Sequence, residues 1–208
     1  MSIVHLIDTI AEWAQVNICN HVQLKQPPKD LDAADDERLD YQLIKPAAFP
    51  MYVPTSEKLP PNIHSPFPSL CVRFANGADE PAASKGSIKI EFCFSAWDPG
   101  THGLDLFEPN GDATFRRKWT ADEAKAYFKR NADGWRDVWN FVDVALRALE
   151  STVIIGGHYT IDLTKPIEFG PLKEQEAIAD FYPFWFAWVS FTVNYDLRRN
   201  IAEIQHLL

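Results

Sequence analysis

Cysteine is scarce in this chain, and the features of secreted and membrane proteins are missing. The 208 residues include three cysteines, which lie far apart and form no C-x-x-C pair. Such a set does not make a disulfide framework, so we expect reduced, structural thiols. No apolar run reaches the roughly 20 residues of a membrane-spanning helix. The first residues lack the basic start and apolar core of a secretory signal, so we expect a cytoplasmic protein.

The motifs of nucleotide-binding and nucleophilic sites are also missing. Neither G-x-x-x-x-G-K-[ST] nor G-x-G-x-x-G occurs, and there is no G-x-S-x-G elbow. The 29 acidic and 20 basic residues give a net charge of −9, which argues against a protein that grips nucleic acid by neutralising phosphates. We therefore expect no cofactor, no specific nucleic-acid binding and no membrane association.

One loop carries residue types that could ligate a divalent metal. Asp98, His102 and Asp105 lie close together in a glycine-containing segment, and carboxylates and imidazole are competent ligands. Their spacing matches no established metal motif, and these residues are common in loops, so we expect no metal here. A small metal-dependent enzyme with a site built from Asp98, His102 and His158 remains an alternative.

Hydrophobic periodicity predicts a single α+β domain over residues 1–208. We expect a mixed or antiparallel sheet of about four to five strands, packed by two to three helices. Helical spacing or capping signals predict helices over residues 3–18, 120–130, 135–149 and, at the end of the chain, 201–208. Alternation predicts strands over residues 69–75, 87–95, 153–163 and 181–195, with a loop of about ten residues between the first two. We expect this loop to begin at the Asn76-Gly77 turn signal.

Residues 26–68 differ in composition from the rest of the chain. The segment is rich in proline and includes an acidic cluster between Asp30 and Asp40. Proline removes backbone donors and like charges repel each other, so the composition predicts an extended excursion within the domain rather than a folded unit.

The last predicted strand is unusually aromatic. From Val189 to Tyr195 it alternates apolar and polar residues, as a strand with one solvated face does. Before that point, the face that should be polar carries Tyr182, Phe184, Phe186 and Trp188, of which the last three are the candidate subunit interface. Such a face requires a cover, which is either another part of this chain or another chain, and we expect a second copy. A monomeric ligand-binding module, with these aromatics as a pocket wall, is a further alternative.

The order of these parts resembles a known class of structural proteins. An opening amphipathic helix, a proline-rich run ending in Pro66-Phe67-Pro68-Ser69-Leu70, and a strand pair are followed by Gly134-Trp135-Arg136-Asp137-Val138-Trp139-Asn140-Phe141-Val142 on a helix. Pro171-Leu172-Lys173-Glu174-Gln175 then precedes the aromatic strand. This order is similar to that of the prophage-encoded tail terminator and tail-completion proteins of long-tailed phages.

The resemblance implies a structural phage tail protein that is not an enzyme. It implies a homo-oligomeric ring, with six subunits as the expectation, at the head–tail junction. Tail-tube and head-connector proteins would be its partners, and the protein would pass from the host cytoplasm into the virion tail. The long excursion departs from the smaller members of this family, so another neck or minor tail protein is an alternative.

Overall fold

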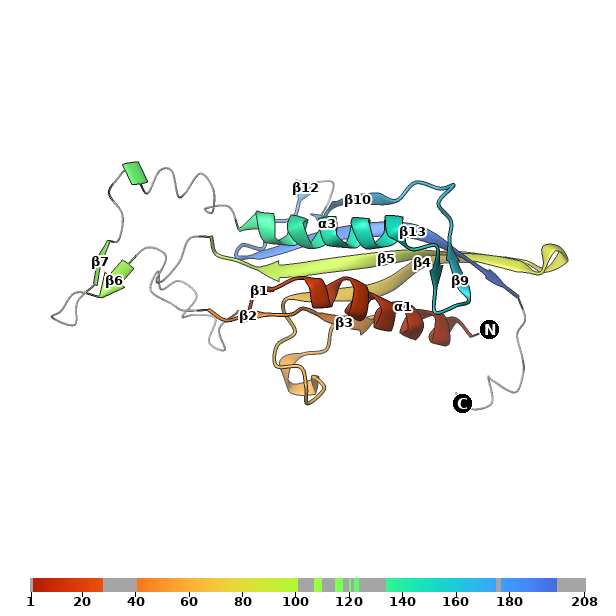
Figure 1. Ribbon diagram of the computed structural model, residues 1–208, viewed down its shortest axis with the longest axis horizontal. Coiled ribbons are helices and arrows are strands. Elements are labelled where there is room, and N and C mark those ends of the chain that lie inside the picture. Colours follow the sequence, from red (N-terminus) through yellow and green to blue (C-terminus); the bar gives the residue numbers. More distant parts are fainter. Residues whose placement is uncertain are drawn as a thin grey trace.

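A curled, mostly antiparallel sheet with two helices on one face forms the body of the molecule (Figure 1). The computed structural model describes residues 2–27, 41–100, 107–109, 115–117, 120, 122–123, 134–174 and 177–197. The expected α+β class and single domain are confirmed. The sheet has seven strands, so the expected four to five strands were too few.

The sheet has the strand order β3-β4-β5-β13-β9-β8, and β10 also pairs with β13. Its strands are β3 (Ala47–Pro50), β4 (Ser69–Glu80), β5 (Lys85–Trp97), β8 (Ile154–Ile155), β9 (Tyr159–Ile161), β10 (Glu168–Pro171) and β13 (Phe184–Asp196). The β3–β4 pair is parallel and the other pairs are antiparallel. Separate two-stranded pairs are β1 (Leu24–Lys25) with β2 (Leu43–Ile44), β6 (Phe107–Pro109) with β7 (Phe115–Arg117), and β11 (Lys173–Glu174) with β12 (Ala177–Ile178).

The helices α1 (Ile3–Asn17) and α3 (Trp135–Ser151) confirm two predicted helices. Short 3-10 turns occupy Cys19–His21, Ser56–Lys58 and Pro81–Ala83. The apolar stripes of both helices pack on the same face of the sheet. Phe141 of α3 contacts Phe94 of β5 edge-to-face at 4.9 Å between ring centroids, and Phe92 contacts Phe191 of β13 at 4.9 Å. Within the described residues, no helix is long and apolar enough to span a membrane.

The β4–β5 hairpin is longer than the sequence predicts. Asn76-Gly77 does not turn the chain. It lies inside β4, where the register with β5 shifts between Phe74 and Asn76. This bulge accommodates one irregular residue while the hydrogen-bonded ladder continues, so the connection begins only after Glu80. The hairpin projects beyond both helices (Figure 1), and its β4 residues 73–80 are exposed.

The proline-rich segment contributes a strand to the sheet that the composition did not predict. β3 lies along β4, and Gln15 of α1 closes its outer edge. The Gln15 side chain accepts a hydrogen bond from Ala48 N at 2.8 Å and donates one to Pro46 O at 3.3 Å. A side-chain amide thereby replaces a neighbouring strand and protects this edge. Residues 28–40 lie outside the described residues.

The start of the helix predicted over residues 120–130 lies within the described residues. Glu123 N donates to Thr120 Oγ1 at 3.5 Å, and Thr120 N donates to Glu123 Oε2 at 3.0 Å, which are the two contacts of a capping box. The rest of the helix expected over residues 120–130, and the one expected over 201–208, lie outside the described residues.

Candidate functional site

The helices cover one face of the sheet, and the candidate interface residues lie on the opposite face, which we call the outer face. In β13 the buried side chains of Ala187, Val189, Phe191 and Val193 belong to the core under the helices. Because side chains alternate along a strand, Phe184, Phe186 and Trp188 belong to the outer face. All three are half-buried.

Two aromatic rings of the same chain partly cover these residues. Phe67, at the end of the proline-rich segment, lies 5.1 Å from Phe184 and 6.4 Å from Phe186 between ring centroids. Phe181 lies 5.6 Å from Phe186 and is 47% exposed. We call Phe67, Phe181, Phe184, Phe186 and Trp188 the aromatic patch. Its own chain covers this patch only in part.

Trp188 fixes the outer strand β10 against β13. Its Nε1 donates to Pro171 O at 3.1 Å. Gly170, opposite Trp188 in the register, leaves room for the indole ring, since an added Cβ would lie 3.1 Å from Trp188 Cζ2. The side chain therefore orders an edge of the sheet and also forms part of the aromatic patch.

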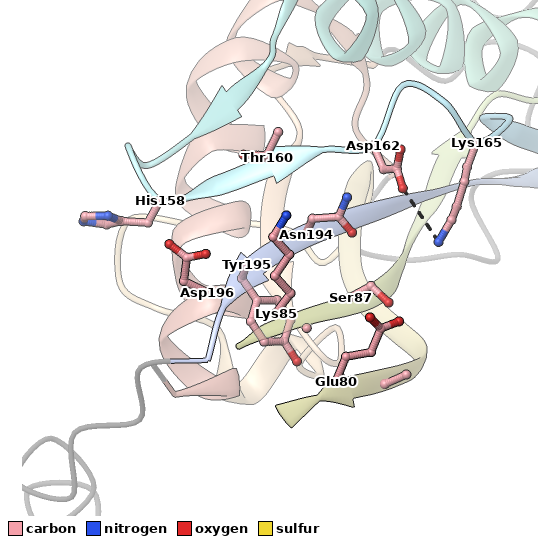
Figure 2. A pocket seen from close by; sticks show the side chains of 12 residues that line it. Glu80, Lys85, Ser87, His158, Thr160, Asp162, Lys165, Asn194, Tyr195 and Asp196 are labelled. Atoms are coloured by element: carbon pink, nitrogen blue, oxygen red, sulfur yellow. Dashed lines mark ion pairs between the residues drawn. The ribbon is translucent and has the colours of Figure 1, made fainter. Parts of the chain in front are cut away.

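The other half of the outer face is polar and hollowed. A depression of about 490 Å³ lies over β5, β9 and β13 (Figure 2). Its lining includes the basic or imidazole groups of Lys85, His158 and Lys165 and the carboxylates of Glu80, Asp162 and Asp196. Lys165 lies 3.7 Å from Asp162 in an ion pair. The mixed charges concentrate neither sign, so this depression does not form a site for a strongly charged ligand.

The structure does not bring together the residues of the enzyme alternative. Asp98 follows the last residue of β5, whereas His158 lines the depression beside Lys85 at the first residue of β5. The 13 residues of β5 span roughly 40 Å at the usual rise of a strand, so Asp98 and His158 cannot share one site. His102 and Asp105 lie outside the described residues. Within the described residues, no group of three metal-ligating side chains is present.

Asp98 instead belongs to a buried ionic cluster with Lys25 and Asp137. Lys25 Nζ lies 2.5 Å from Asp98 Oδ1, and the two side chains are only 15% and 6% exposed. Gly100 N donates to the same Oδ1 at 2.8 Å. The ring of Tyr41 lies 4.9 Å from Lys25 Nζ in a cation–π contact. The cluster connects β1, the end of β5 and the first turn of α3.

The carboxyl group of Asp137 in this cluster has a raised pKa. Burial raises the pKa of its carboxyl group to about 6, and the negative charge of Asp98 acts in the same direction. The positive charge of Lys25 lowers the pKa of Asp137 and so opposes both effects. Hydrogen bonding to the Asp98 carboxyl group also raises the pKa of Asp137. Asp137 can therefore exchange a proton near neutral pH, directly beside an amine.

The backbone around Asp98 is held tightly. Trp185 Nε1 donates to Asp98 O at 2.8 Å. Gly134, at the start of α3, approaches so closely that an added Cβ would lie 2.1 Å from Asp98 O. Only glycine allows α3 to begin at this point, and this approach brings Asp137 into the cluster. Sequence reasoning missed Lys25 and Asp137, since neither lies in a motif and Lys25 is 73 residues from Asp98.

The cysteines do not form a reactive site. Cys19, Cys71 and Cys93 are free thiols, as expected. Burial raises the pKa of all three, that of Cys93 to about 11, so the nucleophilic thiolate is disfavoured at neutral pH.

Comparisons with known proteins give no relative from which a role could be transferred. No protein-family model matches the chain, and no curated protein or solved structure matches it.

Proposed function

We propose that the chain is a structural subunit of a phage tail, a ring-forming tail terminator or tail-completion protein at the head–tail junction. The observation that carries this proposal is the unequal covering of the sheet. Helices bury one face, whereas the other face carries the aromatic patch, whose strand residues are only half-buried. A surface of this kind is typical of a site that a second protein completes.

The shape of the subunit fits a closed assembly. The β4–β5 hairpin projects beyond the helices (Figure 1), and its exposed residues 73–80 offer a second surface away from the aromatic patch. A ring requires two different surfaces on each subunit, because each copy contacts one neighbour with one surface and the next neighbour with the other. We propose a homo-oligomer with six subunits as the expected number.

The charge of the chain fits the same role. A net charge of −9 does not attract the phosphates of DNA, so DNA can pass through such a ring without being held. In this proposal the subunit contacts tail-tube and head-connector proteins, assembles in the host cytoplasm and remains in the virion tail. The role is structural and includes no turnover of a substrate.

In the ring, the neighbouring copy covers Phe184, Phe186 and Trp188. With Phe67 and Phe181 in place these side chains are only half-buried, so a neighbour can bury the remaining apolar area. Burial of apolar surface contributes about 25 cal/mol per Å², and aromatic residues are the side chains most often found in the energetic centre of interfaces.

The test replaces Phe186 with Ser and Trp188 with Thr, and measures mass in solution by light scattering. The wild-type chain is expected to form a closed oligomer, and the double variant a folded monomer. Thr192→Ser with Asn194→Ser changes the same face of β13 at its polar half and serves as the matched control, which should assemble as the wild type does. An unchanged oligomer in a folded aromatic variant would contradict the proposed interface. A wild-type monomer at every concentration would favour the ligand-binding module instead.

A further inference from the structure

We infer that Lys25 and Asp98 are the reacting pair of an intramolecular amide crosslink, an isopeptide bond, with Asp137 as the acid that transfers the protons. The inference is independent of the proposed function. It assigns a covalent self-modification to the buried ionic cluster that joins β1, β5 and α3.

The geometry places the nucleophile against its target. Lys25 Nζ lies 2.5 Å from Asp98 Oδ1, so the ion pair holds the nitrogen beside the carboxyl group that it is to attack. Burial of both side chains matters as much as the distance. In water, an ammonium and a carboxylate are strongly solvated and remain ions. In a site with little solvent, the ions lose this advantage, which favours conversion of the ion pair into an uncharged amide.

The step balances without a further reactant. Within the ion pair, a proton first passes from the Lys25 ammonium to the Asp98 carboxylate. The resulting amine attacks Asp98 Cγ, and a C–N bond forms. Asp137 donates its carboxyl proton to the departing oxygen of Asp98 and receives a proton from the Lys25 nitrogen, so it ends in its starting state. The C–O bond breaks and one water leaves. Overall, an ammonium and a carboxylate become a secondary amide and water, with no change in oxidation state.

Asp137 and Gly100 supply the help that this reaction needs. The carboxyl group of Asp137 hydrogen-bonds to that of Asp98, and burial raises its pKa to about 6, so it carries an exchangeable proton close to neutral pH. Gly100 N donates to Asp98 Oδ1 at 2.8 Å. This backbone N–H can stabilise the negative charge that develops on that oxygen during the attack.

The structure contains a matched pair that should not react. Lys89 Nζ lies 2.5 Å from Glu168 Oε2, the same separation as in the cluster, but these side chains are 39% and 51% exposed. Water solvates both ions there. Burial and a neighbouring proton donor, rather than distance, therefore distinguish the Lys25–Asp98 pair.

The experiment measures the intact mass of the purified full-length chain after folding. We expect a mass about 18 Da below the sequence mass, since one water is lost in the covalent step. Proteolysis should then release a branched peptide that joins Lys25 to Asp98. The variants Lys25→Arg and Asp137→Asn should keep their full sequence mass, whereas Lys89→Arg should show the same loss as the wild type.

Two results would overturn the inference. One is a folded wild-type protein that retains its full sequence mass after prolonged incubation. The other is a mass loss found elsewhere, for example as a cyclic imide at Asp133-Gly134, which hydroxylamine would cleave. Circular dichroism of each variant shows whether it is folded. The wild-type measurement decides the question even if a variant does not fold.

Discussion

Replacing Gly86 with Ala should destabilise the protein far more than a single methyl group normally does. Gly86 in β5 lies opposite Tyr195 in β13, and the phenol ring covers the glycine. An added Cβ would lie 2.3 Å from Tyr195 Cε2, 2.5 Å from its Cζ and 2.8 Å from Asp79 Oδ1. These separations are too short for real contacts, so the ring must leave its place.

The size of the effect follows from what the ring loses. Tyr195 is 6% exposed, and its hydroxyl donates to Asp79 Oδ1 at 2.8 Å. Exposing the ring costs about 1.5–3 kcal/mol and losing a hydrogen bond to a carboxylate costs a similar amount. Replacing glycine in a strand returns only about 0.5–1 kcal/mol. We expect the free energy of unfolding to fall by roughly 2–5 kcal/mol.

Urea unfolding followed by tryptophan fluorescence measures this change. Gly77→Ala in β4 is the matched control, because an added Cβ there lies 3.2 Å from Ser87 O and should cost less than about 1 kcal/mol. Gly86→Ala combined with Tyr195→Ala should be about as stable as Tyr195→Ala alone, since both changes remove one contact. A Gly86→Ala variant as stable as the wild type would show that the Tyr195 ring is not displaced.

Three further changes test other parts of the structure. Gln15→Ala should lower the free energy of unfolding, measured in urea, by about 1–2 kcal/mol, since the edge of β3 loses two hydrogen bonds. An unchanged free energy of unfolding would show that these two hydrogen bonds do not stabilise the edge. The pKa of Asp137, raised from 3.8 to about 6, means that the folded state binds its proton more tightly, so this group makes stability fall as pH rises from about 4 to about 6. In a Lys25→Arg background, which blocks the crosslink, Asp137→Asn should remove this fall and raise the free energy of unfolding at pH about 8 by about 1–2 kcal/mol. This is less than the full shift gives, because the group is partly solvated. Thermal melts across pH measure the change, and an unchanged pH profile would contradict the raised pKa of Asp137. Phe67→Ala should increase the binding of a hydrophobic dye and cost about 1–3 kcal/mol, because it uncovers Phe184; unchanged dye binding would show that Phe67 is not a cover.

Periodic patterns predicted the elements that border the core. The stripe over residues 3–18 became α1, and the alternation over residues 87–95 and 189–195 became the central strands β5 and β13. These predictions succeed because burial on one face imposes a repeat on consecutive residues. The same alternation placed Phe184, Phe186 and Trp188 on the face away from the helices.

The sequence pattern does not predict contacts between segments that are far apart in the chain. β3 is four residues long, ends in proline and belongs to a segment that composition marks as irregular. Its place in the sheet depends on β4 and on Gln15 of α1. The cluster of Lys25, Asp98 and Asp137 likewise depends on three elements meeting, and no local spacing indicates it. The Asn76-Gly77 signal misled because the pairing of β4 with β5 outweighs a local turn preference.

In the proposed ring, a second copy of the chain covers the aromatic patch. Oxidative footprinting of the wild-type chain, dilute and concentrated, tests it most directly by comparing the reactivity of Phe184, Phe186 and Trp188 with that of Trp135. Trp135 lies at the first residue of α3 and is 41% exposed, so it serves as an internal reference. The account predicts that the three outer-face residues become protected on concentration while Trp135 does not. Equal reactivity of the patch at both concentrations, in a sample shown to be oligomeric, would contradict it.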